Sequence, residues 1–490
     1  MKITRQHKVQ HSLKPSVHPY MNGAWTPNFT EYDAEDMQVI GVIPADIDGV
    51  YVRNTENPVQ EPIGNYHPFD GDGMLHVMAF KDGKASYKNR FIHTRGFLAE
   101  QEAGAALWTG IANNPALSKR PGMGAQGGVK DSSSTDVVIH AGKILTTFWQ
   151  CGEGYRLDPY TLEQEGVEGW TPIDGISAHP KVDPATGEML FFNYSKYPPY
   201  QHYGVVDKNN KLVHYTPIPT PGPRLPHDMA FSKNYSILID LPLFWDPELL
   251  KQGRHQATFY SNVPTRFAIF PRYGTAEDVQ WFEAEPTYVL HWGNAYEEGD
   301  ELVLDGYFQE KPDPDPLPGL PPMVGKLMAG VDMNSFKSKL HRWRFNLKTG
   351  EVKEQHLDER ILEFGVFNQQ YAGNKAKYLY SVTGEPGWFL FNGLVKHNLE
   401  TGESWHLPFG EQRFGSEAPF APRVNAQDED DGYLVSFITD MQLDQSECIL
   451  VDAKDIEAGP VCRIILPHRI SSGTHATWAD GGSLRALQGQ

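Results

Sequence analysis

Four histidines occupy positions where a loop meets an apolar or aromatic segment. The segments read "ISAHPKVDP", "LPHDMAFS", "YVLHWGNAYEEGDELVL" and "SSGTHATWAD", and their histidines are His179, His227, His291 and His475. Neutral imidazole nitrogens suit iron, copper or zinc, so four such side chains meeting at one point could hold a first-row metal. A histidine near the end of a strand is more often a structural residue that makes a hydrogen bond. Residue type alone therefore leaves both interpretations open.

Two carboxylates could support such ligands. Glu363 lies in "RILEFGVFNQQ" and Glu417 in "RFGSEAPFAPR". An acidic side chain among apolar neighbours needs a partner, and a histidine ligand needs a hydrogen bond on its second ring nitrogen. A salt bridge to a neighbouring arginine is the alternative role for each.

Other metal-binding patterns do not occur in the sequence. The motif HExxH and Cys–His finger spacings are absent. Cys151, Cys448 and Cys462 are few and far apart, which argues against both a disulfide framework and a zinc cluster. We find no acidic and amide cluster that would predict a calcium-dependent propeller hydrolase.

Short alternating runs joined by tight turns recur along the chain. Asx and Gly residues accept the turn dihedrals and the flanking residues alternate, which is typical of β-hairpins. The copies are "VMAFKDGKASYKNRF", "VVIHAGKILTTFW", "YRLDPYTLEQEG", "PKVDPATGEMLFF", "GVVDKNNKLVHY", "WRFNLKTGEVKE", "VKHNLETGESWHL" and "CILVDAKDIEAGPVCRIIL".

The distribution of these hairpins predicts an all-β fold. Their uneven spacing and long insertions favour a propeller of four-stranded blades over a solenoid, with a large β-sandwich as the alternative. The four histidines are 48, 64 and 184 residues apart, roughly one blade or a multiple of one. Because the inner strands of different blades end near one axis, this spacing makes a shared site possible.

Helices are expected only in insertions. Residues 96–111 have an amphipathic period, and residues 246–253 predict a short helix opened by Asp-Pro. The segment 311–330 is Pro-rich and then apolar, which predicts a long loop over one face. In the absence of a Ser-rich or charged linker, we expect residues 1–490 to form a single domain.

The overall charge and hydropathy limit the classes of partner that the protein could have. The net charge of −19, from 43 basic and 62 acidic residues, argues against nucleic acid. The N-terminal segment lacks the apolar core of a secretory signal, and no run approaches the ~18 apolar residues of a spanning helix. We therefore expect a cytoplasmic protein, with peripheral contact to a membrane left open.

The histidine segments, together with "HPFDGDGMLHVMAF", "RFGSEAPFAPR" and "EDDGYLVSFI", resemble the carotenoid cleavage oxygenases, a family that includes stilbene-cleaving and isoeugenol-cleaving enzymes. The similarity runs from about residue 40 to residue 480. It implies a seven-bladed propeller over residues 40–480, preceded by an N-terminal extension of residues 1–39, with helical and loop insertions covering one face. It also implies one Fe(II) per chain, held by the four histidines, with O₂ as co-substrate and no organic cofactor.

The resemblance assigns further residues around the iron. Glu363 and Glu417 match two of the three glutamates that hydrogen-bond the histidine ligands in the family. The third falls in the expected strand "ILTTFWQCG", where this chain has Gln150, an acceptor without negative charge. Thr135 matches a position near the open face of the iron. The implied reaction adds both atoms of O₂ across a C=C bond and gives two carbonyl products.

The resemblance also bears on the substrate. Stilbene and isoeugenol cleavers bind a phenol through a tyrosine and a lysine, where this chain has residues 112–115 ("ANNP") and Phe148-Trp149. Without those polar groups a buried phenolate is poorly stabilised, and the tunnel suits a polyene. Phe69 and Trp149 are predicted to line it, with core packing as the alternative. The apolar part of the loop, from Leu317 to Ala329, is a candidate membrane patch or a lid.

Three functions follow. The preferred one is an Fe(II) dioxygenase that cleaves a carotenoid or apocarotenoid. The second is cleavage of a stilbene or phenylpropanoid alkene by the same chemistry. The third is a propeller that binds a ligand or partner without catalysis, for which Gln150 gives some support. The oligomeric state is not predicted.

Overall fold

The chain divides into two compact units, which we describe separately. The computed structural model describes residues 1–490 except 112, 126, 253–256, 321 and 489–490. The first unit comprises Met1–Ala178 and Phe409–Gln490, and the second comprises His179–Pro408.

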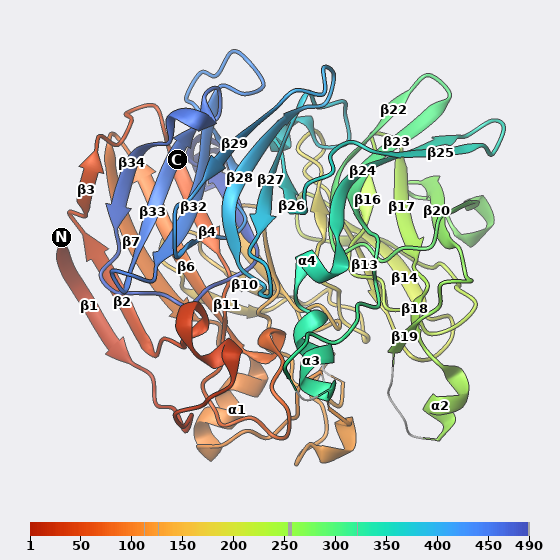
Figure 1. Cartoon of the computed structure of the whole chain (residues 1–490), viewed down its shortest axis with the longest axis horizontal. Coiled ribbons are helices and arrows are strands. Elements are labelled where there is room, and N and C mark those ends of the chain that lie inside the picture. Colours follow the sequence, from red (N-terminus) through yellow and green to blue (C-terminus); the bar gives the residue numbers. More distant parts are fainter. Residues whose placement is uncertain (112, 126, 253–256, 321, 489–490) are drawn as a thin grey trace. The chain divides into compact units, whose positions relative to one another are not determined.

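The second unit is built from four antiparallel sheets of four strands each, and their strands follow one another in the chain (Figure 1). Their strands are β12 (Lys181–Val182), β13 (Met189–Tyr194), β14 (Gln201–Val206) and β15 (Leu212–Pro217); β16 (Ala230–Phe231), β17 (Tyr235–Asp240), β20 (Thr265–Pro271) and β21 (Gln280–Ala284); β22 (Trp292–Glu298), β23 (Glu301–Gln309), β24 (Ser338–Asn346) and β25 (Val352–His356); β26 (Leu362–Val366), β27 (Tyr378–Gly384), β28 (Phe391–Asn398) and β29 (Ser404–Pro408). A small ribbon, β18 (Leu243–Trp245) with β19 (Ala257–Phe259), lies between β17 and β20 in sequence.

Apolar side chains fill the space between neighbouring sheets of this unit. Phe267 on β20 contacts Trp292, Trp343 and Phe345 from the next sheet, with ring centroids 4.8–5.9 Å apart. Their rings are almost completely buried, which favours face-to-face packing of sheets. A four-stranded antiparallel meander packed in this way is the blade of a β-propeller.

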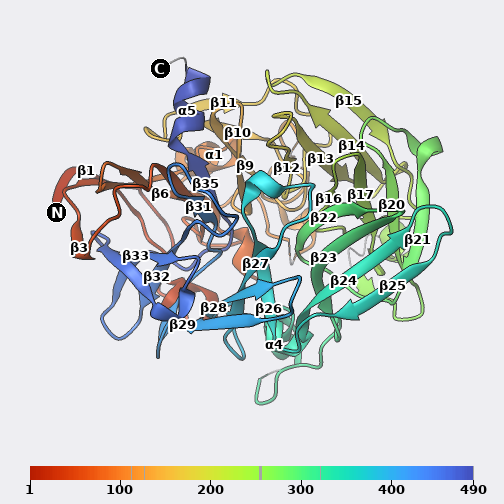
Figure 2. The same cartoon turned by 90° about the horizontal axis from the view of Figure 1, so that it is seen from above.

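The first unit contains three sheets, of seven, four and six strands (Figure 2). Their strands are β1 (Lys2–Lys8), β2 (Thr30–Glu35), β4 (Gly49–Arg53), β5 (Glu56–Asn57), β6 (Asp72–Lys81), β7 (Lys84–Phe91) and β35 (Ala476–Asp480); β8 (Asp136–His140), β9 (Lys143–Thr147), β10 (Tyr155–Leu157) and β11 (Gln164–Val167); β3 (Gln38–Gly41), β30 (Arg413–Phe414), β31 (Phe420–Pro422), β32 (Gly432–Asp440), β33 (Gln445–Asp452) and β34 (Pro460–Ile465). The expected extension 1–39 thus supplies β1 and β2 to one sheet and the first half of β3 to another.

Chain closure occurs within the first unit. The C-terminal strand β35 pairs with β4 from Ala476↔Arg53 to Asp480↔Gly49, and β3 pairs with β34. Residues from both ends of the chain share one core, which includes Tyr51, Met78, Phe437, Cys448 and Ile464. The cysteine thiols of Cys151, Cys448 and Cys462 are free and buried.

All eight predicted hairpins are present as antiparallel pairs. The all-β class is therefore confirmed, and the sheets have propeller-blade topology. The hairpins could be predicted from the sequence because each depends on a few turn residues and on the alternation of apolar and polar residues in its own strands.

The helices are few and short. They are α1 (Arg95–Ala103), α2 (Pro247–Lys251), α3 (Pro322–Ala329), α4 (Met333–Phe336) and α5 (Gly481–Gln488), with 3-10 turns η1 (Pro19–Met21), η2 (Gly23–Trp25), η3 (Pro68–Asp70), η4 (Pro115–Leu117), η5 (Ala276–Asp278), η6 (Gln369–Tyr371) and η7 (Ile456–Ala458). None of the described helices has the length and apolar character needed to cross a bilayer.

Two helix predictions need correction. The helix expected over 96–111 ends at Ala103, because Gly104 takes a left-handed conformation (φ 61°) and caps the helix. The segment 311–330 is not entirely loop, since Pro322–Ala329 forms α3, with Pro322 in the first turn, where proline is tolerated. Helix α2 matches the prediction, and Asp246 caps it by accepting the N–H groups of Glu248 and Leu249.

Candidate metal centre

Each predicted histidine lies directly before an edge strand of a sheet or close to it. His227 lies shortly before β16, His291 immediately before β22, and His179 two residues before β12. In the first unit, His475 immediately precedes β35. The loop-to-strand junctions read from the sequence are therefore the edges where the sheets begin.

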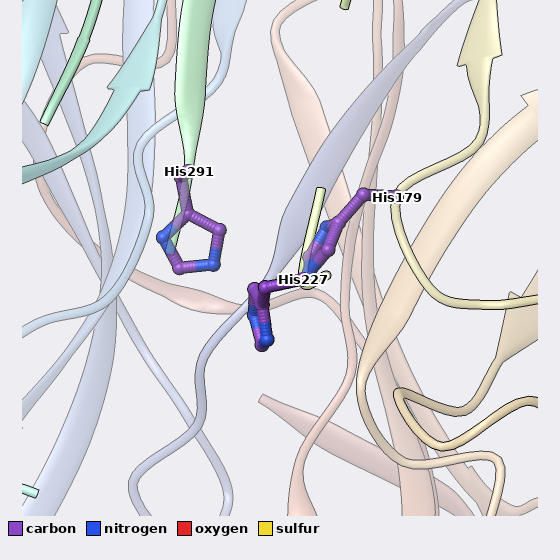
Figure 3. A group of neighbouring side chains, drawn as sticks. All are labelled: His179, His227 and His291. Carbon is purple, nitrogen blue, oxygen red and sulfur yellow. The ribbon is translucent and has the colours of Figure 1, made fainter. Parts of the chain in front are cut away.

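Three of the histidines meet in the second unit. Figure 3 shows the imidazoles of His179, His227 and His291 converging from three separate segments. One ligand nitrogen from each lies within 4.8 Å of the other two, and the ring centroids are 4.8–5.1 Å apart. This spacing is close to the span of about 4 Å between opposite ligands of one ion with bonds of about 2 Å. All three side chains are buried, so the donor set fits a first-row divalent metal.

His179 reaches the cluster from an uncommon backbone conformation. Its φ is 65°, in the left-handed region that residues other than glycine rarely adopt. Such a conformation costs of order 1 kcal/mol and persists where the surroundings enforce it, often at functional sites.

A buried carboxylate holds one of the three rings. Glu363 Oε2 lies 2.6 Å from His291 Nδ1 and also accepts the N–H of Phe364 at 2.7 Å. Glu363 is completely buried, and the Phe364 ring packs against His291 at 4.5 Å. This contact fixes the ring orientation and makes Nε2 the nitrogen that could bind a metal, as in a carboxylate–histidine–metal triad. The partner of Glu363 is therefore a histidine rather than an arginine.

The first unit contains a second histidine–carboxylate pair. His475 Nδ1 lies 3.2 Å from Glu417 Oε2, which also accepts the N–H of Ala476 at 2.7 Å. Burial alone would lower the pKa of His475, but the hydrogen bond and charge of Glu417, with the charges of Asp136 and Glu56, raise it overall. The same geometry seen at His291 thus recurs in the other unit.

Two buried acids near these histidines were not singled out from the sequence. Asp228 follows His227 directly and accepts the N–H of Trp292, the residue after His291, at 2.9 Å. Glu56 accepts the hydroxyl of Thr474 at 2.8 Å, and burial raises its pKa to about 7. The signal for Asp228 was available: it is an acidic residue in the apolar segment "LPHDMAFS", the criterion that identified Glu363.

The remaining predicted residues lie together in the first unit. Thr135 Oγ1 accepts the N–H of Trp149 at 3.1 Å, and Trp149 meets Phe69 edge to face with centroids 6.2 Å apart. Both rings are half-buried. Gln150 is in a turn rather than in the expected strand, because β9 ends at Thr147. Of the residues 112–115, Ala112 lies outside the described residues.

Comparison with known proteins places these features in a family. The family described as retinal pigment epithelial membrane protein, RPE65, matches residues 25–480. A carotenoid 9,10(9',10')-cleavage dioxygenase of Arabidopsis thaliana is 32% identical, with 96% of this chain and 91% of the relative covered. An isoeugenol monooxygenase of Pseudomonas putida is 29% identical, with 94% and 98% covered. The crystal structure of a Pseudomonas brassicacearum lignostilbene dioxygenase superposes with a TM-score of 0.82 at 27% identity, covering 96% of this chain and all of that one.

Proposed function

We propose that this chain, which belongs to the retinal pigment epithelial membrane protein (RPE65) family of carotenoid cleavage oxygenases, is an Fe(II)-dependent dioxygenase that cleaves a C=C bond of a carotenoid or apocarotenoid. The products are two carbonyl compounds, each with one oxygen atom from O₂. One Fe(II) per chain is required and no organic cofactor takes part.

The three-histidine cluster carries this proposal. His179, His227 and His291 offer neutral nitrogen donors in a buried setting, and Fe(II) bound there would supply the electrons that activate O₂. Glu363 holds the His291 ring with Nε2 turned toward the ion. Burial of the cluster excludes water, which protects reactive species from side reactions.

We propose His475 as the fourth ligand, with Glu417 as its hydrogen-bonding partner. The support is its place before the edge strand β35, as His291 precedes the edge strand β22, and a carboxylate pairing like that of His291. We also propose that the chain forms a single propeller domain with seven blades. Gln150 takes the place of the third family glutamate and would accept from an imidazole without adding charge.

The proposed substrate is an apolar polyene. Phe69 and Trp149 form a half-buried aromatic pair, and Thr135, which holds the Trp149 backbone, is proposed near the reacting face. Phe148, at the position of the phenol-binding lysine, is buried and apolar. The proposed membrane-docking patch lies between Leu317 and Ala329, and the cytoplasmic location stays a prediction.

The second candidate is cleavage of a stilbene or phenylpropanoid alkene. It is favoured by the likeness to the isoeugenol monooxygenase and to the lignostilbene dioxygenase. It differs from the first in substrate alone, since the histidine cluster serves both.

The test is mass spectrometry of products after anaerobic Fe(II) loading and exposure to O₂ with a panel of apocarotenoids and phenolic alkenes. We expect aldehydes from the polyenes and loss of turnover in His291→Ala. A matched control is His202→Ala, since His202 stacks on Tyr215 at 5.0 Å, outside the cluster. Turnover of phenolic alkenes alone would move the assignment to the second candidate.

A non-catalytic binding propeller makes different predictions. It would retain little iron after loading, release no carbonyl product from either class, and be indifferent to His291→Ala. That combination of results would refute the dioxygenase assignment.

A further inference from the structure

One carboxylate contacts the chain segments of all three clustered histidines. Asp228 immediately follows His227 and is 3% exposed. Its Oδ2 accepts the N–H of Trp292, the residue after His291, at 2.9 Å. Its Oδ1 lies 2.7 Å from Nζ of Lys181, two residues after His179.

Two of the bonds of Asp228 act on the backbone next to the ligands, and the third is made to the side chain of Lys181. The bond to Trp292 is made to a peptide N–H, so it fixes the peptide that joins Trp292 to His291. A further bond from the N–H of Met229 to Oδ1, at 2.6 Å, fixes the Asp228 side chain against its own backbone. Each of the three segments begins a different sheet, so Asp228 ties together the starts of β12, β16 and β22.

The surroundings of Asp228 provide partners for its buried carboxyl group. A buried carboxylate is costly unless it is paired and hydrogen-bonded. Here the ammonium of Lys181 and two peptide N–H groups satisfy it, and charge-assisted bonds of this kind are stronger than neutral ones. If one of the three segments moved away, the carboxylate would lose a hydrogen-bonding partner. The favourable state is therefore the one in which all three segments are in place around Asp228.

We propose that Asp228 is a positioning residue that sets the mutual spacing of His179, His227 and His291 before a metal binds. The inference rests on the proposed metal site. Because the spacing is fixed in advance, less free energy of binding is spent on ordering the ligands. Asp228 itself makes no contact with the ion.

The test compares Asp228→Asn with Asp305→Asn. Asp305 is equally buried (1% exposed) and pairs with Arg342 at 2.7 and 2.8 Å, but it connects β23 with β24 and not the histidine segments. Co(II) is the probe, titrated anaerobically into the metal-free chain while its visible absorption is recorded, and urea unfolding of each metal-free variant gives its stability.

We expect Asp228→Asn to bind Co(II) about tenfold more weakly, as partners outside the ligand shell do elsewhere, and to shift the Co(II) absorption bands. Asp305→Asn is expected to keep the wild-type affinity and bands even where it lowers stability. If Asp228→Asn does not fold, Lys181→Met replaces it, with a smaller loss in the same direction because both N–H bonds remain.

Two results would overturn the inference: wild-type affinity and bands in the Asp228 variant, or equal weakening in the Asp305 variant. Failure of the wild-type chain to bind Co(II) would instead refute the proposed metal site. The two failures are therefore distinguishable.

Discussion

Replacement of Glu363 by glutamine tests whether the carboxylate behind His291 supports a metal ligand. Glutamine keeps an acceptor oxygen in a side chain of the same shape but removes the negative charge. Glu363 Oε2 lies 2.6 Å from His291 Nδ1 in a completely buried position, so solvent does not screen the interaction.

The magnitude follows from the kind of hydrogen bond lost. A bond to a charged group contributes about 1.5–3 kcal/mol and a neutral one about 1 kcal/mol. The difference of about 0.5–2 kcal/mol corresponds to roughly 2- to 30-fold weaker metal binding. The measurement is the dissociation constant for Co(II) or Fe(II) under anaerobic conditions.

Glu417→Gln is the matched comparison. Its bond to His475 is longer, at 3.2 Å, and its side chain is 14% exposed, so we expect a smaller loss of less than about fivefold. An affinity within twofold of wild type in Glu363→Gln, or a larger effect at Glu417 than at Glu363, would refute the reasoning.

Three further outcomes are expected. Burial, with the nearby charge of Glu153, raises the pKa of Asp131 to about 7 from its usual 3.8, so between these values the folded state holds a proton that the unfolded state has released. As the pH rises through this range, the free energy of unfolding should therefore fall, relative to that of Asp131→Asn, by up to about 1.4 kcal/mol per pH unit. Urea unfolding of both proteins at pH 5 and pH 7 measures this difference. Thr135→Val removes the acceptor of the Trp149 N–H and should lower the free energy of unfolding by about 1–2 kcal/mol, whereas an unchanged value would show that water replaces the hydroxyl. Chelation of the metal should lower the melting temperature reversibly by mass action, and His291→Ala should abolish the difference between the loaded and the chelated protein in differential scanning calorimetry.

Several local features could be predicted from the sequence. The turn "DPATGE" places Asp183 and Gly187 where a hairpin needs them, and β12 and β13 form around it. Helix α2 begins at an Asp-Pro pair for the same local reason. The end of α1 and the presence of α3 were not predicted. The conformation of Gly104 ends α1 and Pro322 begins α3, but a glycine can also lie within a helix and a proline can also lie in a loop.

The site was predictable only in part. His179, His227 and His291 could be chosen by residue type and by their place before a strand, but their convergence depends on how three sheets pack. Asp228 could have been singled out as an acidic residue in an apolar segment, but its role depends on Lys181 and Trp292, which are 47 and 64 residues away in sequence.

The sequence by itself determined the all-β class, the hairpins and the supply of nitrogen donors, because turn dihedrals and strand alternation act between residues a few positions apart. Tertiary structure decided which imidazoles share one point, which carboxylate holds which ring, and that Asp228 joins three segments. Those relations depend on the packing of buried side chains between sheets, an interaction between residues far apart in the chain that no local pattern encodes.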